Sequence, residues 1–188
     1  MIITTNKSGR PINQAVQIWI ATVIHITKIS YTSEMLIAME DSYKVRRLTL
    51  QDVVEGNYLK VLAELTTVQS SQVPISKEVL TKRFESLDPF RHHIVVLVRS
   101  SDNLIVGAGT LLIEEKFIHD CGRVGHIEDV VVSRDARGGG LGKQLISHLL
   151  LVARESGCYK AILDCDERNV AFYEKCGMVK KGIQMAFY

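Results

Sequence analysis

The stretch that most constrains this chain runs from residue 125 to 143 and reads GHIEDVVVSRDARGGGLGK. Its β-branched segment, Ile127 to Val132, predicts a strand, and an amphipathic helix is expected after the glycine-rich loop. Glycine has no Cβ, so the loop backbone can take positive φ angles and approach a ligand closely. The unpaired N–H groups at the start of the helix favour an anion. A phosphate or pyrophosphate is the expected ligand.

The spacing of the loop separates the known kinds of nucleotide site. A P-loop, G-x-x-x-x-G-K-[ST], would need glycine where Arg137 stands and a hydroxyl where Gln144 stands. A dinucleotide fingerprint that starts at Gly138 would need glycine at Lys143. What remains, R-x-x-G-x-G from Arg137, resembles the pyrophosphate loop of the GNAT acetyltransferase superfamily. A glycine-rich turn without a ligand is the alternative.

Composition fits a single folded domain. The chain has 188 residues, 46% of them hydrophobic, and a net charge of +2, which argues against disorder and against a nucleic-acid-binding surface. Its four cysteines lack the paired C-x-x-C spacing of a zinc site, and we interpret them as reduced thiols of an intracellular protein. They are Cys121, Cys158, Cys165 and Cys176.

The first 42 residues differ from the rest. No acidic residue precedes Glu34, and the apolar run from Ile12 to Ile29 is too short and too interrupted to span a membrane. We predict a non-catalytic extension at 1–42 and a catalytic domain at 43–188, in a cytoplasmic protein. A weak organelle-targeting segment is the alternative interpretation of the extension.

From residue 43 the elements can be predicted in order. Strands are expected at 43–48, 94–98, 104–113, 123–132, 159–165 and 183–188. Helices are expected from an N-cap at Asp52 to Leu65, from Ser76 to Asp88, from Leu141 to near Gly157, and at 170–175. This order, β-α-α-β-β-β-α-β-α-β, predicts an α/β (α+β) fold with a mostly antiparallel mixed sheet. A central parallel pair is expected where a right-handed crossover flanks the loop.

A Rossmann enzyme is the competing fold. Asp164 lies about 20 residues past the loop, where a ribose-binding acid is expected. However, only 24 residues follow Asp164, too few for the further βα units, and a predicted hairpin precedes the loop.

Several motifs together resemble one family. They are GHIEDVVV from Gly125, the loop to Lys143, GCYK from Gly157, ILDC from Ile162 and NVAFYEKCG from Asn169, with LTTV from Leu65 and E-x-K-x-I-H from Glu114. The chain over 43–188 is similar in these motifs to the glucosamine-6-phosphate N-acetyltransferases of the GNAT superfamily. The resemblance implies acetyl transfer from acetyl-CoA to the 2-amino group of glucosamine 6-phosphate, on the route to UDP-N-acetylglucosamine. It implies no metal.

The resemblance also implies a set of site residues. Acetyl-CoA would be held at splayed strands by Val130, Val131, Val132, Arg137, Gly138, Gly139, Gly140, Leu141, Gly142, Lys143, Asn169, Tyr173 and Lys175. Glucosamine 6-phosphate would be bound by Thr66, Lys116, His119, Glu128, Asp129 and Asp164, with Lys116 and His119 as the ligands of its phosphate. Tyr173, Asp164 and Glu128 would be catalytic, with Asp164 nearest the amine and Tyr173 as the acid for the leaving thiolate.

Some details stay open from the residues alone. Glu128 and Asp129 are neighbours, so a regular strand would point them to opposite faces, and without the resemblance they could equally be structural carboxylates paired with Arg123 or Arg134. A side chain, a backbone carbonyl or a water could accept the amine proton. Phe172 and Tyr173 cannot share one position on a helix; we expect Phe172 to pack on the sheet and Tyr173 to face the thioester.

Two further expectations concern the chain end and assembly. The family carries an arginine near its C-terminus that helps to bind the phosphate, whereas this chain ends MAFY. An acetyltransferase for another amine, or an idle CoA-binding module, is therefore an alternative. The resemblance also implies a homodimer whose sugar site draws on both subunits, and the apolar segment 183–188 is a sheet edge that a partner could cover.

Overall fold

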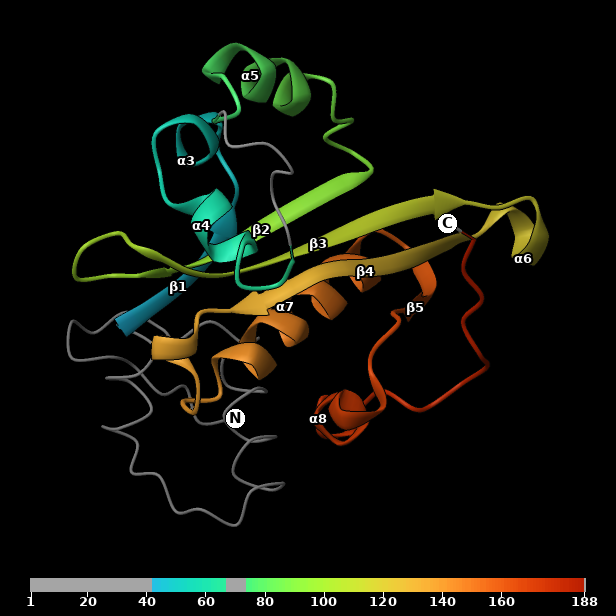
Figure 1. Cartoon of the computed structure of the whole chain (residues 1–188). Helices are drawn as coiled ribbons and strands as arrows, with labels where there is room; N and C mark the ends of the chain where they lie inside the picture. The colour runs from blue at the N-terminus through green and yellow to red at the C-terminus, as the bar shows by residue number, and fades with distance from the viewer. Residues whose placement is uncertain (1–41, 67–73, 188) are drawn as a thin grey trace, which may run out of the picture. The chain divides into compact units, whose positions relative to one another are not determined.

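The structure is a computed structural model that describes residues 42–66 and 74–187 (Figure 1). The chain divides into two compact units, Met1–Lys44 and Val45–Tyr188. The extension predicted at 1–42 lies outside the described residues, apart from Ser42.

Five strands form one mixed sheet in the order β1-β2-β3-β4-β5. They are β1 (Tyr43–Arg47), β2 (His92–Arg99), β3 (Ile105–Glu115), β4 (Arg123–Val132) and β5 (Cys158–Ile162). Strand β3 pairs antiparallel with β2 and with β4, and β4 pairs parallel with β5. The predicted meander and the parallel crossover are therefore confirmed.

Helices lie on both faces of the sheet (Figure 1). They are α3 (Leu50–Val54), α4 (Tyr58–Leu62), α5 (Lys77–Glu85), α6 (Ile118–Cys121), α7 (Leu141–Glu155) and α8 (Val170–Lys175), with 3-10 turns at Arg134–Ala136 and Glu167–Asn169. Tyr58 and Val61 of α4 pack with Val96, Ala108 and Val131 on one face. On the other face, α7 buries the side chains of Leu145, Ile146 and Leu149 against Leu111 and Ile127. The helical periodicity predicted from Leu141, Leu145 and Leu149 is confirmed.

The first predicted helix is wrong in its start and its length. Thr49, not Asp52, is the N-cap, and Asp52 completes a capping box from the N3 position. The salt bridge from Arg46, 2.6 Å away, lowers the pKa of Asp52 to about 2. The helix then breaks between α3 and α4 at Gly56, where a Cβ would lie only 2.6 Å from the carbonyl oxygen of Asp52.

The end of the chain also differs from the prediction. Strand β5 stops at Ile162 rather than Cys165, and residues 183–187 form no strand. A strand needs a neighbouring edge to which it can hydrogen-bond, and along 183–187 the alternate side chains Ile183, Met185 and Phe187 are 92%, 90% and 100% exposed. The parallel β4–β5 pair therefore lies at one side of the described sheet and not at its centre.

Asn57 joins α4 to the sheet. Its side-chain amide donates to the carbonyl of Ile105 (2.8 Å), and its oxygen accepts from the Ile105 N–H (3.1 Å). We expect Asn57→Ala to lower the free energy of unfolding by about 2 kcal/mol, because two part-buried backbone groups lose their partners. Urea denaturation measures this. Gln51→Ala on the exposed face of α3 is the control, and an equally small change in both variants would contradict the assignment.

Candidate active site

The pairing between β4 and β5 ends well before β4 does. Their parallel register runs from Arg123↔Cys158 to His126↔Ile162. Beyond this pair β4 continues to Val132, held only on its other side, where Val131 and Val132 pair with β3. No described strand lies along the remaining edge of β4, so its backbone groups can hydrogen-bond an extended ligand as an added strand would.

The glycine loop follows directly at the end of this edge. Gly138 and Gly140 have φ angles of 98° and 77°, and a Cβ on either would meet nothing within 4 Å. Gly140 is the N-cap of α7, without a side-chain hydrogen bond and without an acidic residue in the first turn. Arg137 Nε donates to the carbonyl of Val132 (2.9 Å) and closes the loop onto β4. The first N–H groups of α7 therefore have no side-chain partner from the cap residue, and the start of this helix suits an anion.

A β-bulge changes the position predicted for the two adjacent carboxylates. Thr110 pairs with Glu128 and Ala108 with Val131, so Asp129 and Val130 lie opposite the single residue Gly109, and Asp129 has a φ of 53°. Ile127 and Val130 both pack with the α7 cluster. Glu128 and Asp129 therefore both fall toward the opposite, α4 face, and the expectation of opposite faces is wrong.

Glu128 lies within a cluster of negative charge. Partial burial raises its pKa, and the charges of Asp129 and Asp164 raise it further, although His126 acts in the other direction. Asp164 lies two residues beyond the end of β5, and its Oδ2 accepts a hydrogen bond from Gln184 (2.9 Å). Three of the residues predicted for the sugar site, Glu128, Asp129 and Asp164, therefore lie close enough for the charges of the two aspartates to act on Glu128.

The aromatic pair on α8 packs against α7. Phe172 rests on the glycine loop, since a Cβ on Gly142 would lie 3.1 Å from its Cζ, while Tyr173 packs with the α7 cluster. The rings meet edge to face at 5.0 Å. Burial, and then the neighbouring thiols of Cys165 and Cys176, raise the pKa of Tyr173, so the phenol keeps its proton at neutral pH.

Lys116 and His119 lie away from these groups, in the β3–β4 loop before Arg123. Lys116 forms an ion pair with Glu114, whose other oxygen lies 2.9 Å from His126 Nε2, and the His119 ring lies 4.2 Å from that of Tyr159. Arg123 lies five positions before Glu128 on β4, roughly 17 Å of backbone. The Lys116 ammonium is thus held by Glu114 beside His126, two residues before Glu128 on β4.

Three further residues predicted for the site, Thr66, Asn169 and Lys175, are exposed. Thr66 is exposed just beyond α4, with its N–H bonded to the carbonyl of Leu62 (3.2 Å). Asn169 and Lys175 are exposed at the two ends of α8. Lys143 lies close enough to Cys176 to lower its pKa, against the stronger effect of burial.

The polar partners of these residues were not predicted. Glu114 pairs with Lys116 and, across the β3–β4 register, with His126. Glu64 accepts a hydrogen bond from the turn after β4. Both arrangements join residues far apart in the chain, so only strand register or tertiary contact could show them. Glu114 stands within a quoted motif, but nothing in its spacing indicates a role.

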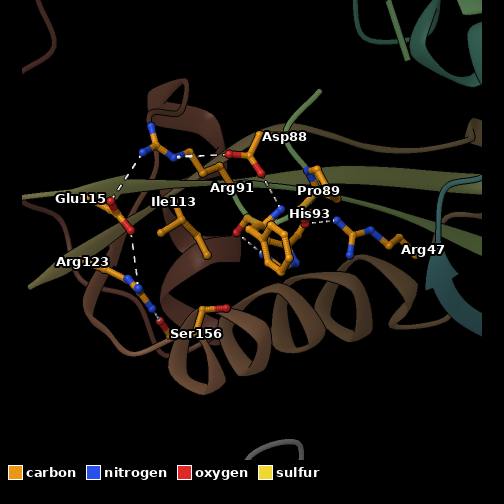
Figure 2. A pocket seen from close by; sticks show the side chains of 10 residues that line it. Arg47, Asp88, Pro89, Arg91, His93, Ile113, Glu115, Arg123 and Ser156 are labelled. Atoms are coloured by element: carbon orange, nitrogen blue, oxygen red, sulfur yellow. Dashed lines mark hydrogen bonds and ion pairs between the residues drawn. The ribbon is translucent and has the colours of Figure 1, made fainter. Parts of the chain in front are cut away.

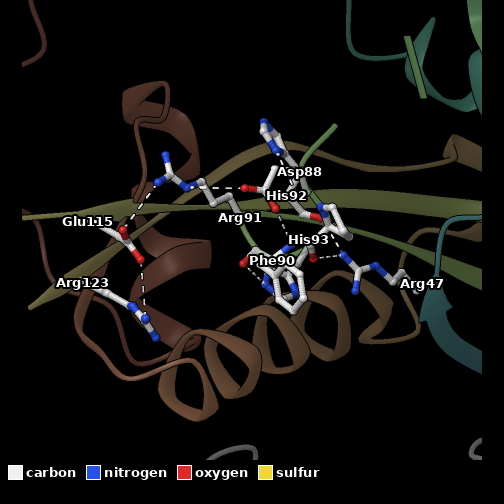
Figure 3. A network of polar contacts seen from close by, with 9 residues as sticks. Arg47, Asp88, Phe90, Arg91, His92, His93, Glu115 and Arg123 are labelled. Atoms are coloured by element: carbon white, nitrogen blue, oxygen red, sulfur yellow. Dashed lines mark hydrogen bonds and ion pairs between the residues drawn. The ribbon is translucent and has the colours of Figure 1, made fainter. Parts of the chain in front are cut away.

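A cavity of about 510 Å³ lies elsewhere, against the C-terminal end of α7 (Figure 2). Figure 3 shows that its guanidinium groups already have protein partners. Arg91 and Arg123 each lie 3.5 Å from Glu115, Arg123 donates to the carbonyl of Ser156, and Arg47 donates to those of Pro89 and His92. The cavity contains none of the candidate site residues, and we assign its charges to packing of the hairpin.

Two kinds of feature are absent from the described residues. Within 42–66 and 74–187, no three His, Cys, Asp or Glu side chains gather so as to hold a metal. Over the same residues, no helix has the length and apolar character to cross a bilayer.

Comparison with known proteins identifies the fold. The model of the Acetyltransferase (GNAT) family matches residues 61–178. The chain belongs to the GNAT acetyltransferase family. It is 40% identical over 152 residues to glucosamine 6-phosphate N-acetyltransferase of Arabidopsis thaliana, covering 80% of this chain and 99% of that protein. It is 42% identical over 149 residues to the enzyme of the same name from Candida albicans, covering 78% and 96%.

A solved structure agrees with this assignment. The crystal structure of glucosamine-6-phosphate N-acetyltransferase from Arabidopsis thaliana superimposes with a TM-score of 0.72 at 40% identity, covering 78% of this chain and 98% of that one. The GNAT acetyltransferase fold predicted from the motifs is therefore confirmed.

We predict that Tyr173, which keeps its proton at neutral pH, is the acid for the leaving thiolate. We expect Tyr173→Phe to lower kcat about 10²-fold, because the variant lacks the acid. Acetyl-CoA affinity and the melting temperature should change little, since the ring keeps its packing. Steady-state thiol release and calorimetry measure both. An unaltered kcat, or a variant that unfolds, would return Tyr173 to a purely structural role.

Proposed function

We propose that this GNAT acetyltransferase transfers the acetyl group of acetyl-CoA to the 2-amino group of glucosamine 6-phosphate. The observation that carries the proposal is the open edge of β4, which leads from the carboxylate cluster to the glycine loop. The substrate is taken from the names of relatives that match this chain over almost their whole length.

Acetyl-CoA fits this edge in one direction. Its pyrophosphate would accept hydrogen bonds from the N–H groups at 138–143, at the positive end of the 15-residue helix α7. The pantetheine arm would then run along Val130–Val132 and bring the thioester toward the carboxylates. Gly142 lets Phe172 close over the start of α7, and Asn169 and Lys175 would bind the cofactor from α8.

The reaction needs a base, an oxygen acceptor site and an acid. The amine nitrogen attacks the thioester carbonyl carbon, and the carbon–sulfur bond breaks. A backbone N–H of the unpaired β4 edge would hydrogen-bond the carbonyl oxygen as negative charge develops there. Tyr173 would give its proton to the sulfur.

The carboxylates would bind the amine and accept its proton. The charges of Asp129 and Asp164 favour the substrate as an ammonium ion on binding, and Glu128, whose pKa is raised, is the stronger base. We propose that Glu128 accepts the amine proton, while Asp164 orients the nitrogen. Asp129 and Thr66 would hold the sugar hydroxyls.

Phosphate recognition would come from a second chain. Lys116 and His119 are suited to a phosphate, because charge-assisted hydrogen bonds are the stronger ones, but in this chain Lys116 is paired with Glu114 and the His119 ring lies against Tyr159. A two-fold dimer could bring the loop of one subunit to the carboxylates of the other.

Substrate choice tests the proposal directly. We expect kcat/KM for glucosamine 6-phosphate to exceed that for glucosamine about 100-fold, because two charged contacts are lost with the phosphate. Thiol release with both sugars measures the ratio. Lys116→Ala should reduce it, whereas Lys82→Ala, a lysine on α5 paired with Glu78, should not. Equal values for the two sugars would refute the substrate assignment.

Assembly is tested by mixing inactive variants. Lys116→Ala and Glu128→Ala should each be nearly inactive alone. In a two-fold dimer with shared sites, a refolded equimolar mixture should regain about a quarter of the native activity, because half of the dimers carry one intact site. Light scattering should give the mass of two chains. A monomeric mass with full activity, or no recovery on mixing, would contradict the shared site.

A further inference from the structure

Glu64 makes a long-range contact to the turn after β4. It lies just after α4, and its side chain is 27% exposed. Its two oxygens accept hydrogen bonds from the hydroxyl of Ser133 and from the N–H of Arg134 (2.8 Å), which are 69 and 70 residues away in the chain. The Arg134 guanidinium lies at 4.0 Å and adds little. One carboxylate therefore holds two consecutive residues of the turn.

This turn sets where the glycine loop begins. Ser133 ends the β3–β4 pairing by donating its N–H to the carbonyl of Val106 (2.8 Å), and Arg137 donates back to Val132 (2.9 Å). Only the 3-10 turn Arg134–Ala136 separates Ser133 from the loop. Among the described residues, the side-chain hydrogen bonds to Ser133 and Arg134 come from Glu64. A displacement of Ser133 would carry the N–H groups of the loop with it.

The element that carries Glu64 is itself fixed. Tyr58 and Val61 of α4 are buried in the sheet core, and Asn57 bonds both backbone groups of Ile105. The Glu64 carboxylate is thus anchored on the body of the protein and not on a mobile segment. Hydrogen bonds from Ser133 and then from Arg134 lower the pKa of Glu64, so it acts as an ionised acceptor of both donors.

We propose that Glu64 is a positioning residue that fixes the pyrophosphate loop for acetyl-CoA. The inference rests on the proposed function in one respect, that the loop binds CoA, and it does not depend on the identity of the amine acceptor. Glu64 touches no reacting atom. Its effect should appear in cofactor affinity and in KM for acetyl-CoA, with kcat at saturation nearly unchanged.

The test is CoA binding by calorimetry on full-length protein carrying single changes. Glu64→Ala should weaken CoA binding about tenfold, since charged hydrogen bonds that order the loop are lost. Glu64→Gln should stay within about threefold of wild type, because its amide can still accept from Arg134 N–H and donate to Ser133 Oγ. Glu55→Ala is the matched control, an exposed glutamate whose contacts are to Lys77 (3.5 Å) and Gln51 (3.4 Å), and it should leave affinity unchanged.

Two further measurements separate positioning from general stability. Glu64→Ala combined with Ser133→Ala should bind CoA no more weakly than Glu64→Ala alone, because both changes break the same contact. Hydrogen exchange at the Arg134 amide should speed up in Glu64→Ala and not in Glu55→Ala. If Glu64→Ala fails to fold, Ser133→Ala alone should still weaken CoA binding about threefold.

The outcomes are distinct. Wild-type protein that binds no CoA would overturn both the proposed function and this inference. Wild-type binding that is matched by Glu64→Ala, or by Ser133→Ala where the former does not fold, would overturn the positioning role alone. Affinity lost equally in Glu64→Ala and Glu64→Gln would also overturn it, since the glutamine preserves the contacts.

Discussion

The site depends on one mismatch in hydrogen bonding, between a long strand and a short parallel neighbour. Strand β4 runs to Val132, whereas the pairing with β5 stops at His126↔Ile162. Backbone groups left over at a sheet edge need a partner, and here the glycine loop and α7 begin at the end of that edge. The loop, the carboxylates and α8 are all arranged around this opening.

Local pattern was sufficient to predict most of the sheet and the loop. The β-branched run before Ser133, the leucines of α7 and the left-handed glycine after that helix follow rules that operate within a few residues. The break at Gly56 and the bulge at Asp129 do not. Both are set by tertiary fit, since alternation along β4 predicts the wrong face for Asp129 and helical spacing runs through Gly56.

The candidate site shows the same division. The glycine loop could be predicted from its spacing, and the motifs taken together indicated Glu128, Asp129 and Asp164, which lie close enough in the folded chain for the charges of the two aspartates to act on Glu128. The contacts that position them could not be predicted, because Glu64 with Ser133 and Glu114 with His126 join residues that only the folded chain brings together. The prediction of a last strand at 183–188 was wrong for a related reason. Its alternating pattern describes a segment able to pair, but the pattern does not say with which edge.

The bulge at Asp129 limits how the length of β4 can change in this protein. The one extra residue in β4 determines which face of the sheet each side chain from Val130 to the end of the strand points to. Insertion or removal of a residue there would exchange the facing of Val130 and Val131 between the two cores, and would turn the start of the loop with them. The length of β4 between Ile127 and Ser133 is therefore a fixed frame, within which side chains can change but residues cannot be added or lost.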